Sequence, residues 1–180
     1  MKKIIDLTIL SLVVTAIGAA GRYPLDLTLE ATGGNATTRV TSSVTIRVDR
    51  LMEENRRKRV TDALTYSGYG NFMTALRALP PVGTVALSGR SVELRYARED
   101  AEPTGQRLVL VADRPLFFLG NEGKTRAGYE LTVVELHIDA LGAVSGRMSG
   151  AARVKPSPSG VVLDDFAEQP VELAGHIPTR

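Results

Sequence analysis

Two long segments in which apolar and polar residues alternate constrain the fold of this chain more than any other feature. The first segment is residues 23–31 and the second is residues 40–48. Because successive side chains of a β-strand point to opposite faces, each segment predicts a strand with one buried face and one solvated face. A Gly-Gly-Asn sequence at residues 33–35 predicts the turn of an antiparallel hairpin between them. The apolar positions are Tyr23, Leu25, Leu27, Leu29 and Ala31 in the first segment, and Val40, Val44, Ile46 and Val48 in the second.

The remainder of the chain adds further strand-like segments. Leu108–Ala112 is apolar on both faces, which predicts a central or covered strand. With about eight to ten strands, a sheet that has an apolar face must close or be covered. We therefore expect a mainly β fold: an antiparallel, closed or partly closed barrel that is lipocalin-like and carries a two-helix insertion. The other expected strand segments are Val82–Leu87, Val92–Tyr96, Leu116–Leu119, Tyr129–Asp139, Ala143–Arg153, Val161–Leu163 and Val171–Ile177.

The helical insertion is expected at about residues 52–79, where the apolar period lengthens to that of a helix. Met52, Val60 and Leu64 fall on one face of a first helix, which we expect to end near Gly68. A second short helix should follow as far as Leu79, because two prolines come next. We expect this pair of helices to cap one end of the barrel or to pack on its outer face.

The amino-terminal segment, residues 1–20, has the layout of a signal peptide. Lys2 and Lys3 precede an apolar run that ends in small residues, so we expect a mature chain that begins at Gly21. Residues 21–180 are then a single domain in the periplasm or secreted. A retained amino-terminal helix is the alternative. A membrane anchor is disfavoured because the run is shorter than the ~20 residues that span a bilayer, and we expect no membrane span in the mature chain.

Composition excludes several classes of function. The chain has no cysteine, which excludes disulfides, thiol nucleophiles and thiolate metal sites. Lys and Arg total 22 against 20 Asp and Glu, which gives a formal net charge of +2. This charge is too small to favour a nucleic-acid partner. The absence of Trp and an aromatic content of 5% leave few platforms for base stacking.

Few residues have the arrangement that catalysis or metal binding needs. His137 and His176 are the only histidines, and neither has further ligand-type residues at metal spacing. Glu135 shares a strand face with His137 and could orient its imidazole, although such pairs are commonly structural. The acidic pairs Glu99-Asp100 and Asp164-Asp165 are sequence neighbours that point to opposite faces of a strand. We therefore assign no catalytic residue, no metal ligand and no cofactor.

The densest charge cluster lies at the start of the expected first helix. Arg56, Arg57 and Arg59 could contact an anionic surface or an envelope partner, and they are our candidates for a surface interaction. Glu53 and Glu54 stand three to four residues before Arg57 and its neighbour, so pairing within the helix accounts for part of the cluster.

Five short segments together resemble a family of uncharacterised exported bacterial proteins. The resemblance extends over most of the mature chain. It implies the exported state and the domain boundaries given above, but it supplies no catalytic residues. The segments are residues 45–50 (TIRVDR), 62–64 (DAL), 75–83 with Ala75-Leu76 and Pro81-Val82-Gly83, 94–98 (LRYAR) and 110–116 (LVADRPL).

Together these features predict an exported module that is not an enzyme and that binds either a small apolar ligand or an envelope partner. Support for the ligand is architectural, because a barrel of this size can hold one small molecule. The alternative is an extracytoplasmic enzyme, a hydrolase or isomerase, whose site is assembled from distant strands. If the barrel holds a ligand, we expect an aliphatic lining of Val44, Ile46, Val92, Leu94, Leu110 and Val133.

Overall fold

The computed structural model describes residues 23–34, 38–118 and 126–177, which form one antiparallel β-sheet and one helix. The expected signal peptide, residues 1–20, lies outside the described residues. The elements are, in chain order, β1 (Leu25–Gly34), β2 (Arg39–Val48), α1 (Glu54–Arg77), β3 (Gly83–Leu87), β4 (Arg90–Glu102), β5 (Gly105–Ala112), β6 (Leu131–Asp139), β7 (Ala143–Ser157), β8 (Gly160–Phe166) and β9 (Val171–His176).

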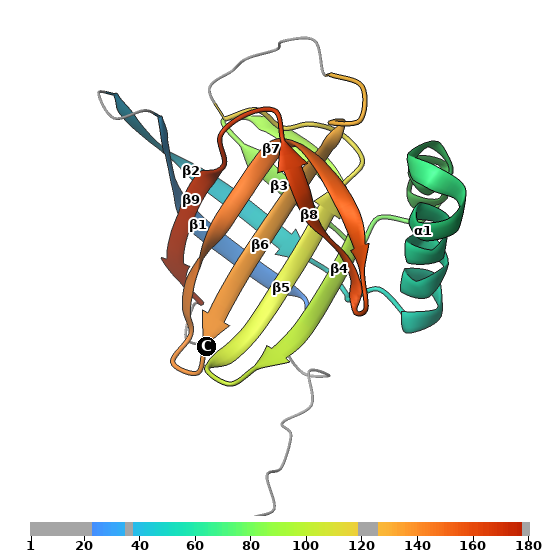
Figure 1. The fold of residues 1–180 in the computed structure, drawn as a ribbon. Coiled ribbons are helices and arrows are strands. Elements are labelled where there is room, and N and C mark those ends of the chain that lie inside the picture. The colour runs from blue at the N-terminus through green and yellow to red at the C-terminus, as the bar shows by residue number, and fades with distance from the viewer. Residues whose placement is uncertain (1–22, 35–37, 119–125, 178–180) are drawn as a thin grey trace, which may run out of the picture.

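The sheet closes on itself to form a barrel (Figure 1). Strands β1 to β6 are neighbours in chain order, β6 pairs with β7, and β9 lies between β7 and β1. Eight strands therefore form the barrel, whereas β8 pairs with β7 alone among the described strands. The expected fold class, a mainly β, lipocalin-like closed antiparallel barrel, is confirmed.

The two alternating segments form the first hairpin of the barrel. Leu27 on β1 lies opposite Ile46 on β2, and their register runs without a shift along both strands. From Leu25 to Ala31 and from Val44 to Val48, every second residue points inward and is buried, while the residues between them are exposed. Val40, which the alternation also placed on the buried face, is 37% exposed. We call the buried residues inside the barrel the interior core: the inward apolar residues of the eight strands with Val82, Leu116 and Phe118. Because each buried aliphatic side chain contributes about 1.5–3 kcal/mol, this core is the main source of stability.

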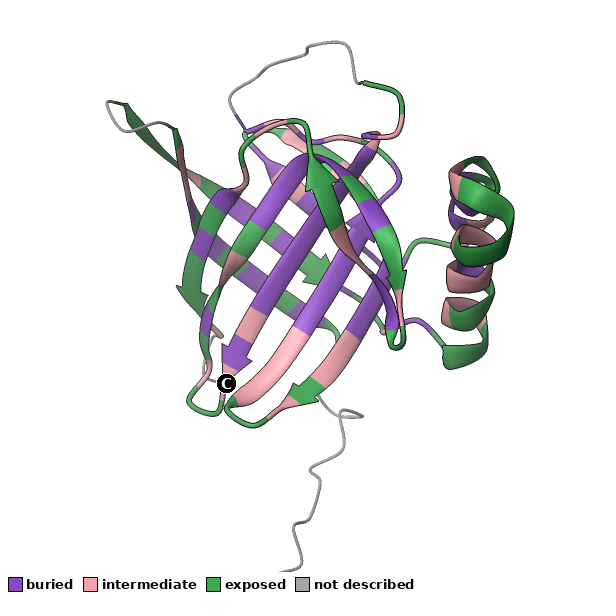
Figure 2. Cartoon of the chain, viewed as in Figure 1, coloured by how far each residue is buried: buried purple, intermediate pink, exposed green. Residues whose placement is uncertain are grey.

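A second apolar cluster, the outer core, lies outside the barrel between its wall and a cover made of α1 and the β7–β8 hairpin. The central strands β5 and β6 are buried on both faces over Leu108–Ala112 and Leu131–Leu136 (Figure 2). Their inward side chains join the interior core, and outward ones such as Val109 and Val111 join the outer core. The outer core consists of Met52, Val60, Phe72, Met73 and Leu76 from α1 and its approach, Tyr96, Val109, Val111, Leu131 and Val133 from the wall, and Ala152, Val154 and Val161 from the hairpin.

The placement of Val133 corrects the expected barrel lining. Val133 belongs to the outer core, whereas its neighbour Val134 belongs to the interior core together with Ile46 and Leu110. Because β6 carries apolar residues at consecutive positions, alternation could not decide which of them faces inward.

The helical insertion is a single element in which two helical segments meet at a kink. α1 runs from Glu54 to Arg77, within the expected 52–79, and Gly68 interrupts it with a non-helical conformation at φ 80° and ψ 173°. The expected break at Gly68 is therefore present, but the element continues through it. α1 packs on the outer face of the barrel, which is one of the two expected positions (Figure 1). In the part of the chain that the structure describes, no helix is long and apolar enough to span a membrane.

The β7–β8 hairpin bends away from the barrel and folds back over the outer face of the wall (Figure 1). β7 has 15 residues, so its first part completes the barrel and its last part pairs with β8. Its register with β8 shifts between Arg153 and Val154. Irregularities of this kind bend a strand locally, and the bend brings the hairpin tip against β4.

Residues 113–118, which follow β5, contribute two side chains to the interior core. Leu116 and Phe118 enter the interior core, and the backbone N–H of Leu116 donates to the carbonyl of Gly150 at 2.9 Å. The described residues Leu116–Phe118 are in no strand, which corrects the expected strand Leu116–Leu119; Leu119 itself lies outside the described residues.

Candidate functional site

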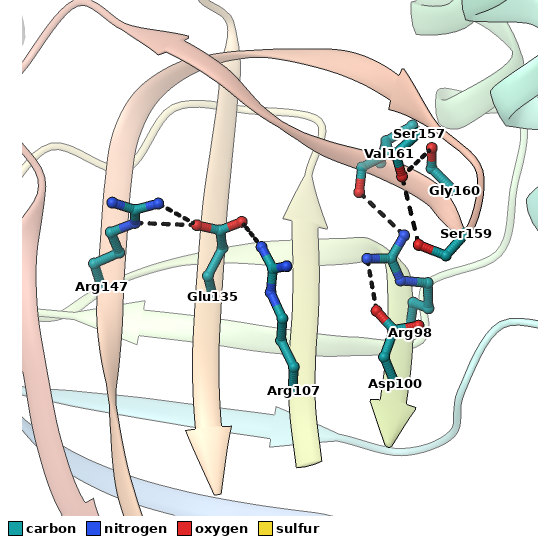
Figure 3. Close-up of polar contacts among 9 residues, drawn as sticks. All are labelled: Arg98, Asp100, Arg107, Glu135, Arg147, Ser157, Ser159, Gly160 and Val161. Atoms are coloured by element: carbon teal, nitrogen blue, oxygen red, sulfur yellow. Dashed lines mark hydrogen bonds and ion pairs between the residues drawn. The ribbon is translucent and has the colours of Figure 1, made fainter. Parts of the chain in front are cut away.

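Six side chains of alternating charge cross the outer face of five neighbouring strands. We call this row the charge ladder: Arg98 and Asp100 of β4, Arg107 of β5, Glu135 of β6, Arg147 of β7 and Glu172 of β9. The strand register produces the row, because Asp100 lies opposite Arg107, Glu135 opposite Arg147 and Arg147 opposite Glu172. Figure 3 shows Arg107 and Arg147 reaching toward Glu135, and Arg98 and Asp100 of β4 paired in a separate group. The charges of the ladder sum to zero.

Glu135 is the centre of the ladder. Its carboxylate accepts a hydrogen bond from Nη2 of Arg107 at 2.7 Å and two from Arg147, at 3.0 Å from Nε and 2.8 Å from Nη2. The Glu135 side chain is only 9% exposed, whereas those of Arg107 and Arg147 are 36% and 51% exposed. The two guanidinium groups compensate the desolvation of the carboxylate. They are thereby fixed in place while part of each still faces solvent.

The Arg98 end of the ladder is closed to solvent by the hairpin tip. Arg98 is 1% exposed, and its guanidinium pairs with Asp100 at 2.8 Å and contacts the carbonyl oxygen of Val161 at 3.4 Å. Its Nε has no hydrogen-bond partner among the described residues. Beside it, the buried hydroxyl of Tyr96 accepts the backbone N–H of Val161 at 3.2 Å, and burial raises the pKa of Tyr96. This end therefore fastens the hairpin to β4 and is not open to a ligand.

The exposed end of the ladder borders a shallow hollow that is open to solvent, which we call the polar hollow. Ser145 and Gly146 of β7 line it, and the side chain of Ser145 is small. Charged groups surround this space, so the hollow offers both donors and acceptors. Besides Ser145 and Gly146 it is lined mainly by Arg107, Glu135, His137, Arg147 and Glu172.

His137 joins two residues at the β4–β5 turn. Its Nδ1 lies 2.9 Å from a carboxylate oxygen of Glu102, and its Nε2 lies 3.4 Å from the hydroxyl of Thr104. Hydroxyl, imidazole and carboxylate follow one another as in nucleophilic catalysis. Thr104 is exposed and the hydroxyl distance is long, however, so the group is not shielded from water as a reacting site would be. The arrangement is best explained as a clamp that holds the turn against β6.

The expected ligand-lining residues are largely brought together inside the barrel. Val44, Ile46, Leu94 and Leu110 are fully buried in the interior core, and Val92 packs against it from a partly buried position. The side chains at these four buried positions have no solvent-accessible surface. An apolar ligand stays a prediction, and it would require this core to open.

The arginines of the helix start are partly committed to other contacts. Arg56 pairs with Glu53 at 3.3 Å, and Lys58 pairs with Asp62 at 2.6 Å. Arg57 lines a groove between α1 and the hairpin tip, which also contains Ser157, Ser159 and several acidic and hydroxyl side chains of α1. Arg59 is exposed. Pairing within the helix is thus present but with other partners than expected, because Glu53 pairs with Arg56 and Lys58 with Asp62. The cluster presents mixed charges instead of a basic patch.

Metal-binding geometry and similarity to known proteins give no further assignment. Within residues 23–34, 38–118 and 126–177, no group of three or more His, Cys, Asp or Glu side chains could hold a metal ion. The chain matches no protein-family model, no curated protein and no solved structure.

Sequence reasoning missed the charge ladder, although part of its signal was present. The expected strands Tyr129–Asp139 and Ala143–Arg153 are adjacent in the chain, and their hairpin places Glu135 opposite Arg147. Asp100 lies opposite Arg107, but this pairing depends on where the turn between β4 and β5 falls. The burial of Arg98 had no such signal, because it depends on how the hairpin folds back.

Proposed function

We propose that the protein is an exported, non-catalytic binding module whose polar hollow recognises a neutral, hydroxyl-rich ligand such as a glycan of the cell envelope. The observation that carries this proposal is the set of arginine and glutamate side chains fixed to one another beside an open hollow. Export rests on the amino-terminal sequence alone.

The charge balance favours a neutral ligand. The ladder contains three cations and three anions, so an ion approaching it gains little net attraction. A hydroxyl group both donates and accepts hydrogen bonds. Vicinal hydroxyls can therefore use the remaining donors of Arg107 and Arg147 together with the neighbouring carboxylate oxygens of Glu172.

The rigidity of the site supports binding without a deep pocket. Arg107 and Arg147 are held by Glu135, so a ligand need not pay the full ordering entropy of two long side chains. Among the described residues that line the hollow there is no Phe, Tyr or Trp to stack on a sugar ring. We therefore expect weak binding, with a Kd in the range of about 0.1–1 mM for a short oligosaccharide.

The test is an NMR titration of the protein with a panel of soluble neutral oligosaccharides, with heparin as the anionic comparison. Ser145→Trp should fill the hollow without removing a ladder contact, and it should abolish shifts at β6 and β7. Thr45→Trp is the matched control, because Thr45 is an exposed outer residue of β2 on a different part of the wall. The proposal is wrong if no neutral oligosaccharide shifts hollow resonances, or if Ser145→Trp binds as wild type does.

A further inference from the structure

The β1–β2 hairpin extends beyond the rim of the barrel as an arm (Figure 1). β2 pairs with β1 from Arg39 to Val48, but with β3 only from Val44 to Val48. Among the described residues, no strand pairs with β2 over Arg39–Ser43 on the side away from β1. The backbone of this stretch is therefore a free strand edge, although the hydroxyl of Ser42 lies 3.3 Å from that of Ser88 in the turn between β3 and β4.

The direction of the backbone groups on this edge follows from the regular part of β2. The carbonyl oxygen of Arg47 lies against Gly83 of β3, and the N–H of Asp49 donates to the carbonyl of Val82 at 2.8 Å. Residues two apart in a strand direct their backbone groups to the same side. Because the β1–β2 register has no shift, Arg39 and Thr41 direct theirs to the open side.

The side chains of the edge also favour pairing. Val40 is 37% exposed, which makes it one of the few large apolar residues that the described chain presents to solvent. Val and Thr suit a strand, and the edge has no proline or bulge of the kind that protects free edges in other proteins. Arg39 is its one charged residue.

We infer that this edge pairs with the same edge of a second copy of the chain, in an antiparallel arrangement centred on Val40. Arg39 then lies opposite the partner's Thr41, and their outward backbone groups exchange hydrogen bonds. The two Val40 side chains meet at the closely spaced, non-hydrogen-bonded position, which covers both of them. A segment that pairs with itself about its central residue meets the requirement of a two-fold interface. The interface is short, so the dimer is weak and concentration-dependent.

Sedimentation velocity over a range of protein concentrations tests the inference. Wild type should shift from monomer to dimer as the concentration rises, and added salt should favour the dimer because it screens the two Arg39 charges. Thr41→Pro removes an N–H that faces the open side and makes no bond to β1, so this variant should stay monomeric. Thr41→Val keeps the N–H and should dimerise as wild type does. Ser145→Trp should also dimerise, which separates this test from the test of the polar hollow.

Two results would overturn the inference: a wild type that is monomeric up to about 1 mM, or a Thr41→Pro dimer as stable as the wild-type dimer. Thermal unfolding of each variant shows whether the arm substitution has disturbed the barrel. If Thr41→Pro is destabilised, Val40→Lys provides the second test, because it places like charges opposite each other and should also abolish the dimer.

Discussion

The interior core and the outer core use opposite faces of the same strands, yet they differ in how they are enclosed. The interior core is surrounded by eight hydrogen-bonded strands, so no part of its wall can leave without breaking a strand pair. The outer core is enclosed by α1 and by a hairpin whose backbone pairs with the wall only through β7 and whose tip contacts β4 through Val161. The barrel can therefore remain folded when α1 and the hairpin move away from it, because the strand pairs that close the barrel do not depend on them.

The two cores also differ in chemistry. The interior core is built from apolar side chains, whereas the outer core lies beside the buried Arg98 and contains the buried phenol of Tyr96. A partly buried phenol, that of Tyr69 on α1, donates its hydroxyl to Glu130 at 2.8 Å, and burial raises the pKa of this tyrosine. Buried polar groups of this kind must find particular partners. They fix where the cover sits more than they add to its stability.

The largest expected effect is in the interior core. Ile46→Ala should lower the free energy of unfolding by about 2–5 kcal/mol, because it removes buried methylene groups and leaves a cavity among fully enclosed neighbours. Chemical denaturation measures the loss. A change below about 0.5 kcal/mol, as at a surface position, would mean that the interior is not the dominant core.

A smaller and more local effect is expected at the cover. A Cβ on Gly160 would clash with the hydroxyl of Tyr96 and would lie 2.8 Å from Nη1 of Arg98, and Gly160 has a φ of +142°. Gly160→Ala should therefore cost about 1–3 kcal/mol. Hydrogen exchange should show faster exchange in β8 and α1 while β1, β2 and β3 stay protected.

Gly70→Ala is the matched control for that variant. Gly70 lies in α1, and a Cβ there meets nothing within 4 Å. Alanine is favoured over glycine in a helix, so stability should be unchanged or slightly raised. If Gly160→Ala instead accelerated exchange equally in β1 and β2, the two cores would unfold as one unit and the comparison would fail.

The sequence predicted the interior core well, because a period of two identifies the inward face wherever the outward face is polar. The rule held for Leu25–Ala31 of β1 and Val44–Val48 of β2, where the residues between the buried ones are exposed. It failed on β6, where Val133 and Val134 are both apolar and both buried. The outer core therefore could not be read from alternation, since its existence depends on what covers the wall.

The candidate site was less predictable than the fold for a related reason. Cross-strand pairs such as Glu135 and Arg147 follow from hairpin register, which a turn position can indicate. The addition of Arg107 and Glu172 requires knowing that β5 and β9 flank that hairpin. Strand order in a closed barrel depends on long-range pairing that one sequence does not display.

The smallest expected effect lies in the β6–β7 turn, which belongs to neither core. One carboxylate oxygen of Asp139 accepts the backbone N–H groups of Leu141 and Ala143, each at 2.8 Å. The bond from Ala143, above all, holds the pKa of Asp139 below its ordinary value. A carboxyl group whose folded pKa is lowered stabilises the fold at pH values above its unfolded pKa, and this contribution is lost as the pH falls through the folded pKa.

Below a pH of about 4, amide protection at Leu141 and Ala143 should therefore decrease while both cores stay protected. NMR-detected hydrogen exchange across the acidic range measures this change. Asp139→Asn keeps an acceptor oxygen but cannot titrate, so its turn should show the same protection throughout. A wild-type turn that stays fully protected at pH values of about 2, or an Asp139→Asn turn that opens in parallel with it, would show that the carboxylate does not hold the turn.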